Sequence, residues 1–388
     1  MNDNTYDVIV VGAGSVGNPA ALFLSESGLK VLVIEKRASA GQGENKAAIG
    51  GVRATHSDGA KITTAIESLR IFSTWKETYG SNIDWKTGGY CFPVYGEPLE
   101  NTLKSYFPIQ RSFGLEIDWL DAQQIAEVVP GINMEGLRGG TYSPGDGQVS
   151  PLKMAAAVHA EAEKRGAQYR YHENVVGYII ESGAIKGVVT EKGKYFAEHV
   201  IIATGADAAL HGKMAGRDIP VVPDSHEAGI SAPVAKFLPP LVVDMRPGPE
   251  GKTANFYFGQ ASGGQIIFCY TPKPAIVGNN KDNLSEFMPI LAARLISLIP
   301  RFKNLLIRKI WRGLYPMTPD GVPIVDYDPE IKGLIWAVGM CGQGFMLGPG
   351  VAKNLTSMIV KGQPLLPPDV QALYSLKRNF HGKTEAFK

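Results

Sequence analysis

Asp7-Val-Ile-Val-Val-Gly-Ala-Gly-Ser-Val-Gly17 is the strongest indication of the fold class of this chain. After Asp7 come four apolar, β-branched residues, which are typical of a buried parallel strand. Its glycines follow where a chain must turn sharply, approach a pyrophosphate and pack a helix against the strand. Glu35, at the end of the next apolar run, is the residue type that accepts both ribose hydroxyls. The stretch therefore predicts a βαβ dinucleotide site for FAD or NAD rather than NADP.

The context of the motif separates it from a glycine turn in an unrelated α/β domain. An apolar helix is expected directly after Gly17, and Glu35 stands eighteen residues further on. Pro19 lies a few residues inside that helix, and proline is tolerated there only within the first turn.

Composition limits the classes of function that the chain can serve. With 388 residues the chain has room for two domains, and 39 basic against 37 acidic residues give a net charge of +2 without charge blocks. This balance does not favour a nucleic-acid or membrane partner. Cys91, Cys269 and Cys341 lack CxxC spacing, so neither a disulfide framework nor a metal site is predicted. No signal-type segment or membrane-length apolar run is seen, and we expect a soluble cytoplasmic protein.

Along the chain, nucleotide-type and β-rich stretches alternate. A glycine-rich loop runs from residue 36 to Arg53, and its place after the ribose-binding strand favours a binding loop. Apolar spacing predicts helices over residues 57–79, 121–128, 150–165, 284–298 and 351–360, with strand-like pieces over the rest of 85–142 and a hairpin turned at Ser182-Gly183.

Two more apolar strands end in glycine turns, near residues 205 and 339, so three such turns are expected at the carboxyl edge of one sheet. No second GxGxxG occurs, and a ligand that reaches from Gly12 to Gly350 fits FAD better than NAD. The predicted fold is α/β, with a Rossmann-like FAD-binding domain interleaved with a smaller α+β substrate domain that has a mixed or antiparallel sheet. The FAD-binding domain is predicted to comprise residues 1–85, 143–218 and 314–388, and the substrate domain residues 86–142 and 219–313.

Five stretches carry a family resemblance, and they occur in the family's order from end to end. They are Val10-Val-Gly-Ala-Gly-Ser-Val-Gly17, Ile49-Gly-Gly-Val-Arg53, Ile201-Ile-Ala-Thr-Gly205, Leu314-Tyr-Pro-Met-Thr-Pro-Asp320 and Gly342-Gln-Gly-Phe-Met-Leu-Gly-Pro-Gly350. With them the chain resembles the FAD-dependent amino-acid oxidoreductases related to D-amino-acid oxidase, in the branch with sarcosine oxidase, glycine oxidase and dye-linked proline dehydrogenases. The resemblance implies a substrate-domain sheet that roofs the isoalloxazine ring.

The glycines at 342–350 also carry a physical expectation. Around a helix start they present backbone N–H groups, and the helix dipole adds positive potential for the reduced flavin. The full set of predicted FAD contacts is Gly12, Gly14, Ser15, Gly17, Glu35, Lys36, Ala48, Val175, Ala203, Thr204, Gly205, Gly342, Gly344, Phe345 and Met346.

Departures from the family pattern narrow the expected chemistry. Gly313 stands where monomeric sarcosine oxidases carry the cysteine that links to FAD, so the FAD is predicted to be non-covalent. Phe268 stands, counting from Gly263, where those oxidases carry a lysine that activates dioxygen. Met346 replaces a lysine that helps to hold the substrate carboxylate. The lack of the dioxygen-activating lysine favours a dehydrogenase that passes electrons to a quinone, a dye-like carrier or a protein.

The predicted substrate residues are Arg53, His56, Tyr257 and Met346. A guanidinium binds a carboxylate through two parallel hydrogen bonds, which makes Arg53 the first candidate. Arg53 has the alternative role of neutralising the FAD pyrophosphate, His56 that of capping the next helix, and Tyr257 that of a packed strand residue. His226 and Cys341 are interpreted as structural.

The predicted function is oxidation of the C–N bond of a small amino or imino acid, such as proline, sarcosine or a D-amino acid, by hydride transfer to flavin N5. One alternative is a 2-hydroxy acid or glycerol phosphate as the donor. Another is a flavin subunit of a larger electron-transfer complex, and a homo-oligomer or hetero-oligomeric dehydrogenase complex is compatible with the sequence.

Overall fold

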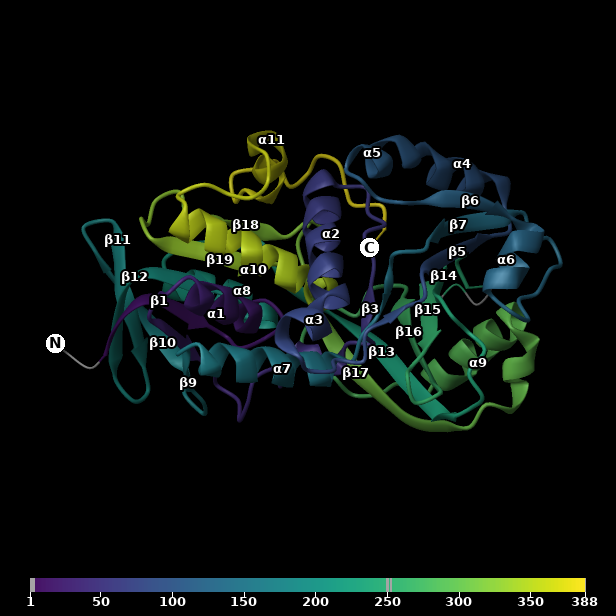
Figure 1. The fold of residues 1–388 in the computed structure, drawn as a ribbon, viewed down its shortest axis with the longest axis horizontal. Coiled ribbons are helices and arrows are strands. Elements are labelled where there is room, and N and C mark those ends of the chain that lie inside the picture. The colour runs from purple at the N-terminus through teal and green to yellow at the C-terminus, as the bar shows by residue number, and fades with distance from the viewer. Residues whose placement is uncertain (1–3, 249–250, 252, 388) are drawn as a thin grey trace.

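Two large sheets lie side by side in the computed structural model, which describes residues 4–248, 251 and 253–387. Figure 1 shows the first sheet and its helices on one side, the second sheet on the other, and α2 (Gly59–Ser73) between them. Because the chain passes between the two halves several times, neither half is a continuous stretch of sequence.

Parallel strands form the centre of the first sheet. In spatial order they are β19 (Leu334–Val338), β12 (Lys194–Ile202), β1 (Thr5–Val11), β2 (Val31–Ile34) and β9 (Gln168–Arg170). Antiparallel strands are added by β18 (Ile324–Tyr327) and by the hairpin β10 (Val175–Glu181) and β11 (Ala184–Thr190). Val11 is in register with Ile202, and Ile202 with Trp336. The glycine turns after β1, β12 and β19 therefore share one edge of the sheet, as the sequence predicted.

Both faces of β1 are buried, which explains its unbroken apolar run. Val8 and Val10 pack into one core cluster, while Ile9 and Val11 pack into a second one on the opposite face. The first cluster also holds side chains of α1 (Gly17–Glu26), α7 (Pro151–Lys164) and α10 (Gly344–Val360). Pro19 falls in the first turn of α1, where no intrahelical N–H bond is lost.

The helix predicted over residues 57–79 consists of two helices. Asp58 caps α2, because its carboxylate accepts hydrogen bonds from the N–H groups of Ala60 and Lys61. α2 ends at Ser73, and α3 (Trp75–Tyr79) follows after Thr74. Shorter elements complete this half: α8 (Ala208–Met214), α11 (Pro368–Gln371), and the 3₁₀ turns η1 (Glu44–Ala47), η2 (Gly205–Asp207) and η4 (Ala372–Tyr374).

The second sheet joins strands from the two β-rich segments of the sequence. Its order is β17 (Ile307–Met317), β13 (Val222–Pro233), β16 (Gln265–Pro272), β15 (Thr253–Gln260), β14 (Leu241–Asp244), β5 (Tyr90–Val94), β7 (Gly139–Ser143) and β6 (Asp118–Asp121). Neighbours are antiparallel except β14 and β5, where the two segments meet. β17 continues past residue 313, and the domain boundaries stay a prediction at the level of single residues.

Helices cover one face of the second sheet. α9 (Phe287–Leu298), α6 (Ala122–Val128) and the 3₁₀ turn η3 (Pro300–Asn304) contribute to one core cluster with the sheet. A small sheet of β3 (Gly51–Val52), β8 (Gly147–Gln148) and β4 (Lys86–Thr87) connects the two halves. No helix in the described part of the chain combines the length and the apolar character of a membrane span.

The prediction for residues 85–142 was wrong in part. α4 (Glu97–Ser105) and α5 (Phe107–Ser112) occupy a region where strand-like pieces were expected. Pro98 and Pro108 resemble breaks in a sequence, but each stands in the first turn of its helix, where proline is well tolerated.

Candidate functional site

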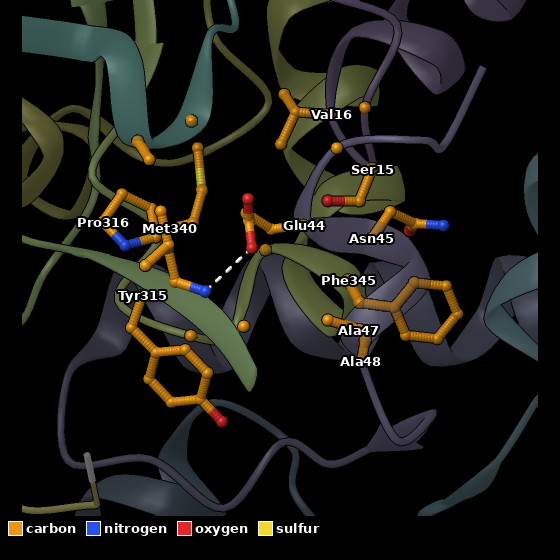
Figure 2. A pocket seen from close by; sticks show the side chains of 18 of the residues that line it. Ser15, Val16, Glu44, Asn45, Ala47, Ala48, Tyr315, Pro316, Met340 and Phe345 are labelled. Carbon is orange, nitrogen blue, oxygen red and sulfur yellow. Dashed lines mark hydrogen bonds between the residues drawn. The ribbon is translucent and has the colours of Figure 1, made fainter. Parts of the chain in front are cut away.

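An elongated cavity of about 450 Å³ runs from the carboxyl edge of the first sheet to the inner face of the second. Its walls come from the turns after β1, β2, β12 and β19 and from strands β13, β15, β16 and β17. Figure 2 shows part of this wall, with Ser15, Glu44, Tyr315 and Phe345 around the same space. The cavity therefore joins the predicted nucleotide end to the predicted substrate end.

The glycines after β1 have different roles. Gly12 has a φ of +100°, and a Cβ there would lie 2.6 Å from the Ala203 carbonyl oxygen. A Cβ on Gly17 would lie 1.9 Å from the Gly12 carbonyl oxygen, so Gly17 permits packing and does not line the cavity. Gly14 has no atom within 4 Å of the position of a Cβ, and it lines the cavity with Ser15. Close approach of a ligand is thus possible at Gly14.

Glu35 lies at the ribose end of the cavity and also stabilises the turn. Its carboxylate accepts a hydrogen bond from the Ala13 N–H at 2.8 Å and another from the Arg37 N–H at 2.9 Å. Each carboxylate oxygen has a second lone pair for a ligand hydroxyl. Lys36 also lines the cavity, and its ammonium group forms a 2.5 Å ion pair with Asp207.

The end of β12 adds a hydroxyl group that has no partner in the protein. Ala203, Thr204 and Gly205 line the cavity, as do Ala48 and Val175. The buried Thr204 Oγ1 makes no hydrogen bond to any described residue. Since a buried hydroxyl without a partner is costly, Thr204 favours a bound polar ligand at this position.

At the other end, α10 begins at Gly344, and Gly342, Gly344, Phe345 and Met346 line the cavity. The helix has no side-chain cap at Gln343, so the N–H groups of its first turn are open to a ligand.

The prediction that the helix starts at Val351 was wrong, because the preceding glycines are helical themselves. A Cβ on Gly348 would lie 1.9 Å from the Ser15 carbonyl oxygen, and one on Gly350 would lie 2.0 Å from the Thr64 carbonyl oxygen. These two glycines let α10 pack closely against the turn after β1 and against α2. They do not present N–H groups to a ligand, and the Gly350 N–H donates to Ser68 Oγ.

Arg53 lines the cavity beneath the second sheet and is 7% exposed. Its guanidinium donates to the carbonyl oxygens of Thr55 and Phe387, the latter at 2.6 Å, and lies over the Phe92 ring. No carboxylate of the described residues forms an ion pair with it. Burial lowers its pKa, but an arginine side chain stays protonated in proteins. The site therefore holds a buried cation without a directly bonded carboxylate from the described chain, although the carboxyl groups of Glu385 and Asp146 lie near enough to raise its pKa.

His56 is fully buried and is not among the residues that line the cavity. Its Nδ1 lies 3.3 Å from the guanidinium of Arg53. Burial, followed by the positive charges of Arg53 and Lys61, holds the pKa of His56 well below its usual range, so the ring is neutral. Asp58 caps α2, so His56 does not have the capping role either.

Aromatic side chains of the second sheet form the roof over this end of the cavity. The hydroxyl groups of Tyr257 and Tyr315 share a short hydrogen bond, and burial raises the pKa of both phenols well above the ordinary value. The His226 ring stacks on Tyr315 with centroids 3.7 Å apart. His226 was interpreted as structural, yet it lines the cavity, as does Tyr90.

Sequence reasoning missed Tyr90, Gln343 and the placement of His226. The signal for Tyr90 and His226 is the alternation of β5 and β13, which aims every second residue toward the cavity once the sheet pairing is known. Tyr315 lies within a quoted motif but was not given a role there.

Phe268 does not face the cavity, contrary to the residue count. It is fully buried in the core cluster behind the second sheet, and Cys269 lines the cavity from the same strand. Neither side chain is a cation, so this strand brings no lysine to the cavity. Gly313 also lines the cavity, with space for a Cβ limited by Ala47 at 2.8 Å. The non-covalent attachment of the cofactor stays a prediction.

Comparison with known proteins gives a consistent result. Residues 7–358 match the family described as FAD dependent oxidoreductase. The chain is 29% identical over 369 residues to glycine oxidase of Geobacillus kaustophilus (strain HTA426), covering 92% of both chains. It is 23% identical to mitochondrial dimethylglycine dehydrogenase of Homo sapiens, of which it spans only 44%.

Among solved structures, L-proline dehydrogenase from P. horikoshii superposes with a TM-score of 0.89 at 30% identity, over 96% of this chain and 97% of that one. The arrangement of both sheets is thus that of a solved fold, and the cavity lies between them.

Proposed function

Because the chain belongs to the FAD-dependent oxidoreductase family, we propose that it oxidises the C–N bond of a small amino or imino acid and acts as a dehydrogenase. Proline, sarcosine-like N-alkyl amino acids and D-amino acids are the candidate substrates. The proposal is supported by relatives named glycine oxidase and L-proline dehydrogenase.

The residues along the cavity fit FAD, the cofactor of the family. Gly14 leaves space at the turn, Glu35 has free lone pairs for ribose, and the Thr204 hydroxyl lacks a protein partner. At the far end, the uncapped start of α10 offers N–H groups to the electron-rich end of a flavin. When bound, FAD supplies the acceptor for the hydrogen and the electron pair that leave the substrate carbon.

The burial of Arg53 without an ion pair among the described residues is the single observation that supports an amino or imino acid as the substrate. A buried guanidinium without an ion pair in the described structure, lining the cavity, is the group that binds a carboxylate most strongly. After burial, the groups that act on the pKa of Arg53 are the phenol of Tyr90, the carboxyl groups of Glu385 and Asp146, and the phenol of Tyr257. A carboxylate held there orients the amine-bearing carbon of the substrate.

The protein's contribution to the reaction is orientation and exclusion of water. Tyr257 and Tyr315 keep their protons, because burial raises their pKa values, so the roof stays neutral over the substrate. An amine that binds in its neutral form needs no base to release the α-hydrogen as hydride. The side chains thus hold the substrate carboxylate at Arg53 while the neutral roof covers the reacting carbon.

The test is the visible spectrum of the FAD-loaded protein mixed without oxygen with L-proline, D-proline, sarcosine and D-alanine. We expect at least one of these to bleach the flavin, and an artificial electron acceptor to restore the colour faster than dioxygen does. Bleaching only by a 2-hydroxy acid or by glycerol phosphate would contradict the proposal.

A second arm tests the role of Arg53. We expect Arg53→Met to lower kcat/KM for the substrate at least about 30-fold, because a charged hydrogen bond contributes about 2 kcal/mol. Arg138→Met, which removes an exposed arginine paired with Glu100, serves as the matched control. An Arg53→Met protein with unchanged kcat/KM would show that the carboxylate binds elsewhere.

A further inference from the structure

The last described segment of the chain, residues 384–387, returns to the middle of the molecule. Figure 1 shows the C-terminal end between the two halves, beside α2 and β3. Glu385 and Phe387 are only 4% and 3% exposed, whereas Lys383 and Thr384 before them are exposed. A buried carboxylate needs partners inside the protein, so the contacts of this segment explain its position.

The main-chain carbonyl of Phe387 contacts two side chains that line the cavity. It accepts a hydrogen bond from Nη2 of Arg53 at 2.6 Å and one from Nε2 of Gln343 at 2.9 Å. Arg53 belongs to the loop after β3, and Gln343 immediately precedes α10. One backbone oxygen thus fixes the candidate carboxylate-binding group relative to the start of α10.

Aromatic packing holds Phe387 in this position. Its ring meets Phe92 edge-on at 5.8 Å and Tyr106 edge-on at 5.3 Å between centroids. Phe92 is also the ring beneath the Arg53 guanidinium. The same aromatic cluster therefore supports both the guanidinium and the backbone that binds it.

Glu385 fixes the segment on its other side. One carboxylate oxygen accepts from the N–H groups of Ser57 and Phe387, both at 3.0 Å. The other lies 3.6 Å from Nζ of Lys61, and both side chains of this ion pair are fully buried. The Ala386 N–H donates to Ser57 Oγ at 2.9 Å. The segment is bound to the loop of Arg53 and to α2 at several points.

The contacts leave the rest of the guanidinium free to face the cavity. Arg53 donates to the carbonyls of Thr55 and Phe387 and contacts Nδ1 of His56, and a guanidinium has five N–H groups in a rigid plane. Two fixed acceptors determine the orientation of that plane. If the Phe387 carbonyl moved away, a buried donor would lose its partner, and the side chain would have to rotate to find another.

We propose that Glu385 and Phe387 are positioning residues of the substrate site, through which residues 384–387 hold the Arg53 guanidinium in the orientation that binds a carboxylate. This inference rests on the carboxylate role of Arg53 in the proposed function. The segment changes how tightly the carboxylate of a ligand binds and leaves the affinity for the rest of the ligand unaffected.

The test compares two ligands of the FAD-loaded protein that differ only in charge, pyrrole-2-carboxylate and pyrrole-2-carboxamide. Binding is measured by the change in the flavin absorption spectrum, with bound FAD per chain determined for every protein. We expect the native protein to bind the carboxylate at least about tenfold more tightly than the carboxamide. In Glu385→Ala that preference should fall to about threefold or less, while the affinity for the carboxamide changes less than about twofold.

Two further variants separate positioning from loss of structure. Glu385→Gln keeps an oxygen for the N–H groups of Ser57 and Phe387, so its preference should lie between those of the native protein and Glu385→Ala. Should Glu385→Ala fail to fold, Phe387→Ala removes the aromatic anchor and should show the same lowered preference. Glu181→Ala, at the exposed end of β10, is the matched control and should keep the native preference.

The binding data distinguish failure of the carboxylate role of Arg53 from failure of the positioning role of residues 384–387. If the native protein does not distinguish the two ligands, the carboxylate role of Arg53 is wrong, and the positioning role of the segment fails with it. If the native protein distinguishes them and the folded, FAD-containing Glu385→Ala or Phe387→Ala does so equally well, only the positioning role is wrong.

Discussion

Asp146 is a carboxyl group that lies buried next to Arg53 without a full set of partners. One oxygen accepts a hydrogen bond from the Ala54 N–H at 3.2 Å, and the other has no partner among the described residues. Burial raises the pKa of Asp146 to about 7, although the Ala54 hydrogen bond and the charge of Arg53 act against this shift. The group is therefore neutral in mildly acidic solution and charged above neutrality.

This shift predicts a specific dependence of stability on pH. Between the unfolded pKa of about 3.9 and the folded value of about 7, the folded protein binds the extra proton, so the free energy of unfolding falls as pH rises. At about 1.4 kcal/mol per pH unit, the contribution of Asp146 amounts to about 2 kcal/mol between pH 5 and pH 7 and to about 3 kcal/mol by pH 8.

Asp146→Asn removes this contribution. Urea unfolding of the two proteins at pH 5 and at pH 8 should show that the variant gains about 3 kcal/mol relative to the native protein at the higher pH. Asp118→Asn, at an exposed position, is the control and should show no such change. Parallel pH profiles of the native protein and Asp146→Asn would contradict the raised pKa.

Among the elements, the turn between β1 and α1 contains glycines required for packing and one glycine that leaves space for a ligand. Gly12 and Gly17 are required by close protein contacts, whereas a Cβ on Gly14 would meet no protein atom. We expect Gly14→Ala to leave the fold intact and to weaken FAD binding at least about tenfold, since the added methyl enters the space of the ligand.

Titration of the apoprotein with FAD measures this effect, and circular dichroism reports the fold. Gly193→Ala is the matched control, because a Cβ on Gly193 also meets nothing but lies in the β11–β12 hairpin, away from the cavity. Unchanged FAD affinity in Gly14→Ala would place the ligand away from this turn.

Some helices and strands have local sequence signals and others do not. Runs of apolar residues and glycine turns are local signals, and they were sufficient to predict β1, α1, β2, β12 and β19. The start of α10 was predicted seven residues too late, since Gly344, Gly348 and Gly350 resemble a loop, while in the fold they allow α10 to approach Ser15 and Thr64. α4 and α5 were missed because Pro98 and Pro108 stand in first turns.

At the scale of the whole molecule, the nucleotide end of the site was predictable and the substrate end was only partly so. Of the 18 site residues predicted from the sequence, 16 line the cavity, and Gly17 and His56 do not. The roof depends on the pairing of strands that lie far apart in sequence, which sets whether Phe268 or Cys269 faces inward. The return of Phe387 to Arg53 spans 334 positions and has no motif at all.

Glu44 connects the two halves of the molecule beside the cavity. In Figure 2 its carboxylate points toward the second sheet, and it accepts a hydrogen bond from the Leu314 N–H of β17 at 2.8 Å. The other carboxylate oxygen forms a 2.5 Å ion pair with Lys281. Leu314 is buried, whereas the Lys281 side chain is 40% exposed. Loss of the hydrogen bond to Leu314 is therefore expected to lower the free energy of unfolding more than loss of the ion pair with Lys281.

The difference predicts unequal effects of two variants on the holoprotein. Glu44→Ala leaves the buried Leu314 N–H without an acceptor, which costs about 1–3 kcal/mol of unfolding free energy. Lys281→Met removes only an exposed ion pair, which contributes about 0–1 kcal/mol and less at high salt. Glu44→Ala removes this ion pair as well as the hydrogen bond. Urea unfolding of both variants at low and high salt measures these effects: the loss in Lys281→Met should shrink toward zero as salt is added, while the larger loss in Glu44→Ala should shrink only in part. Equal losses in the two variants would mean that the ion pair, and not the hydrogen bond to β17, joins the nucleotide loop to the roof of the site.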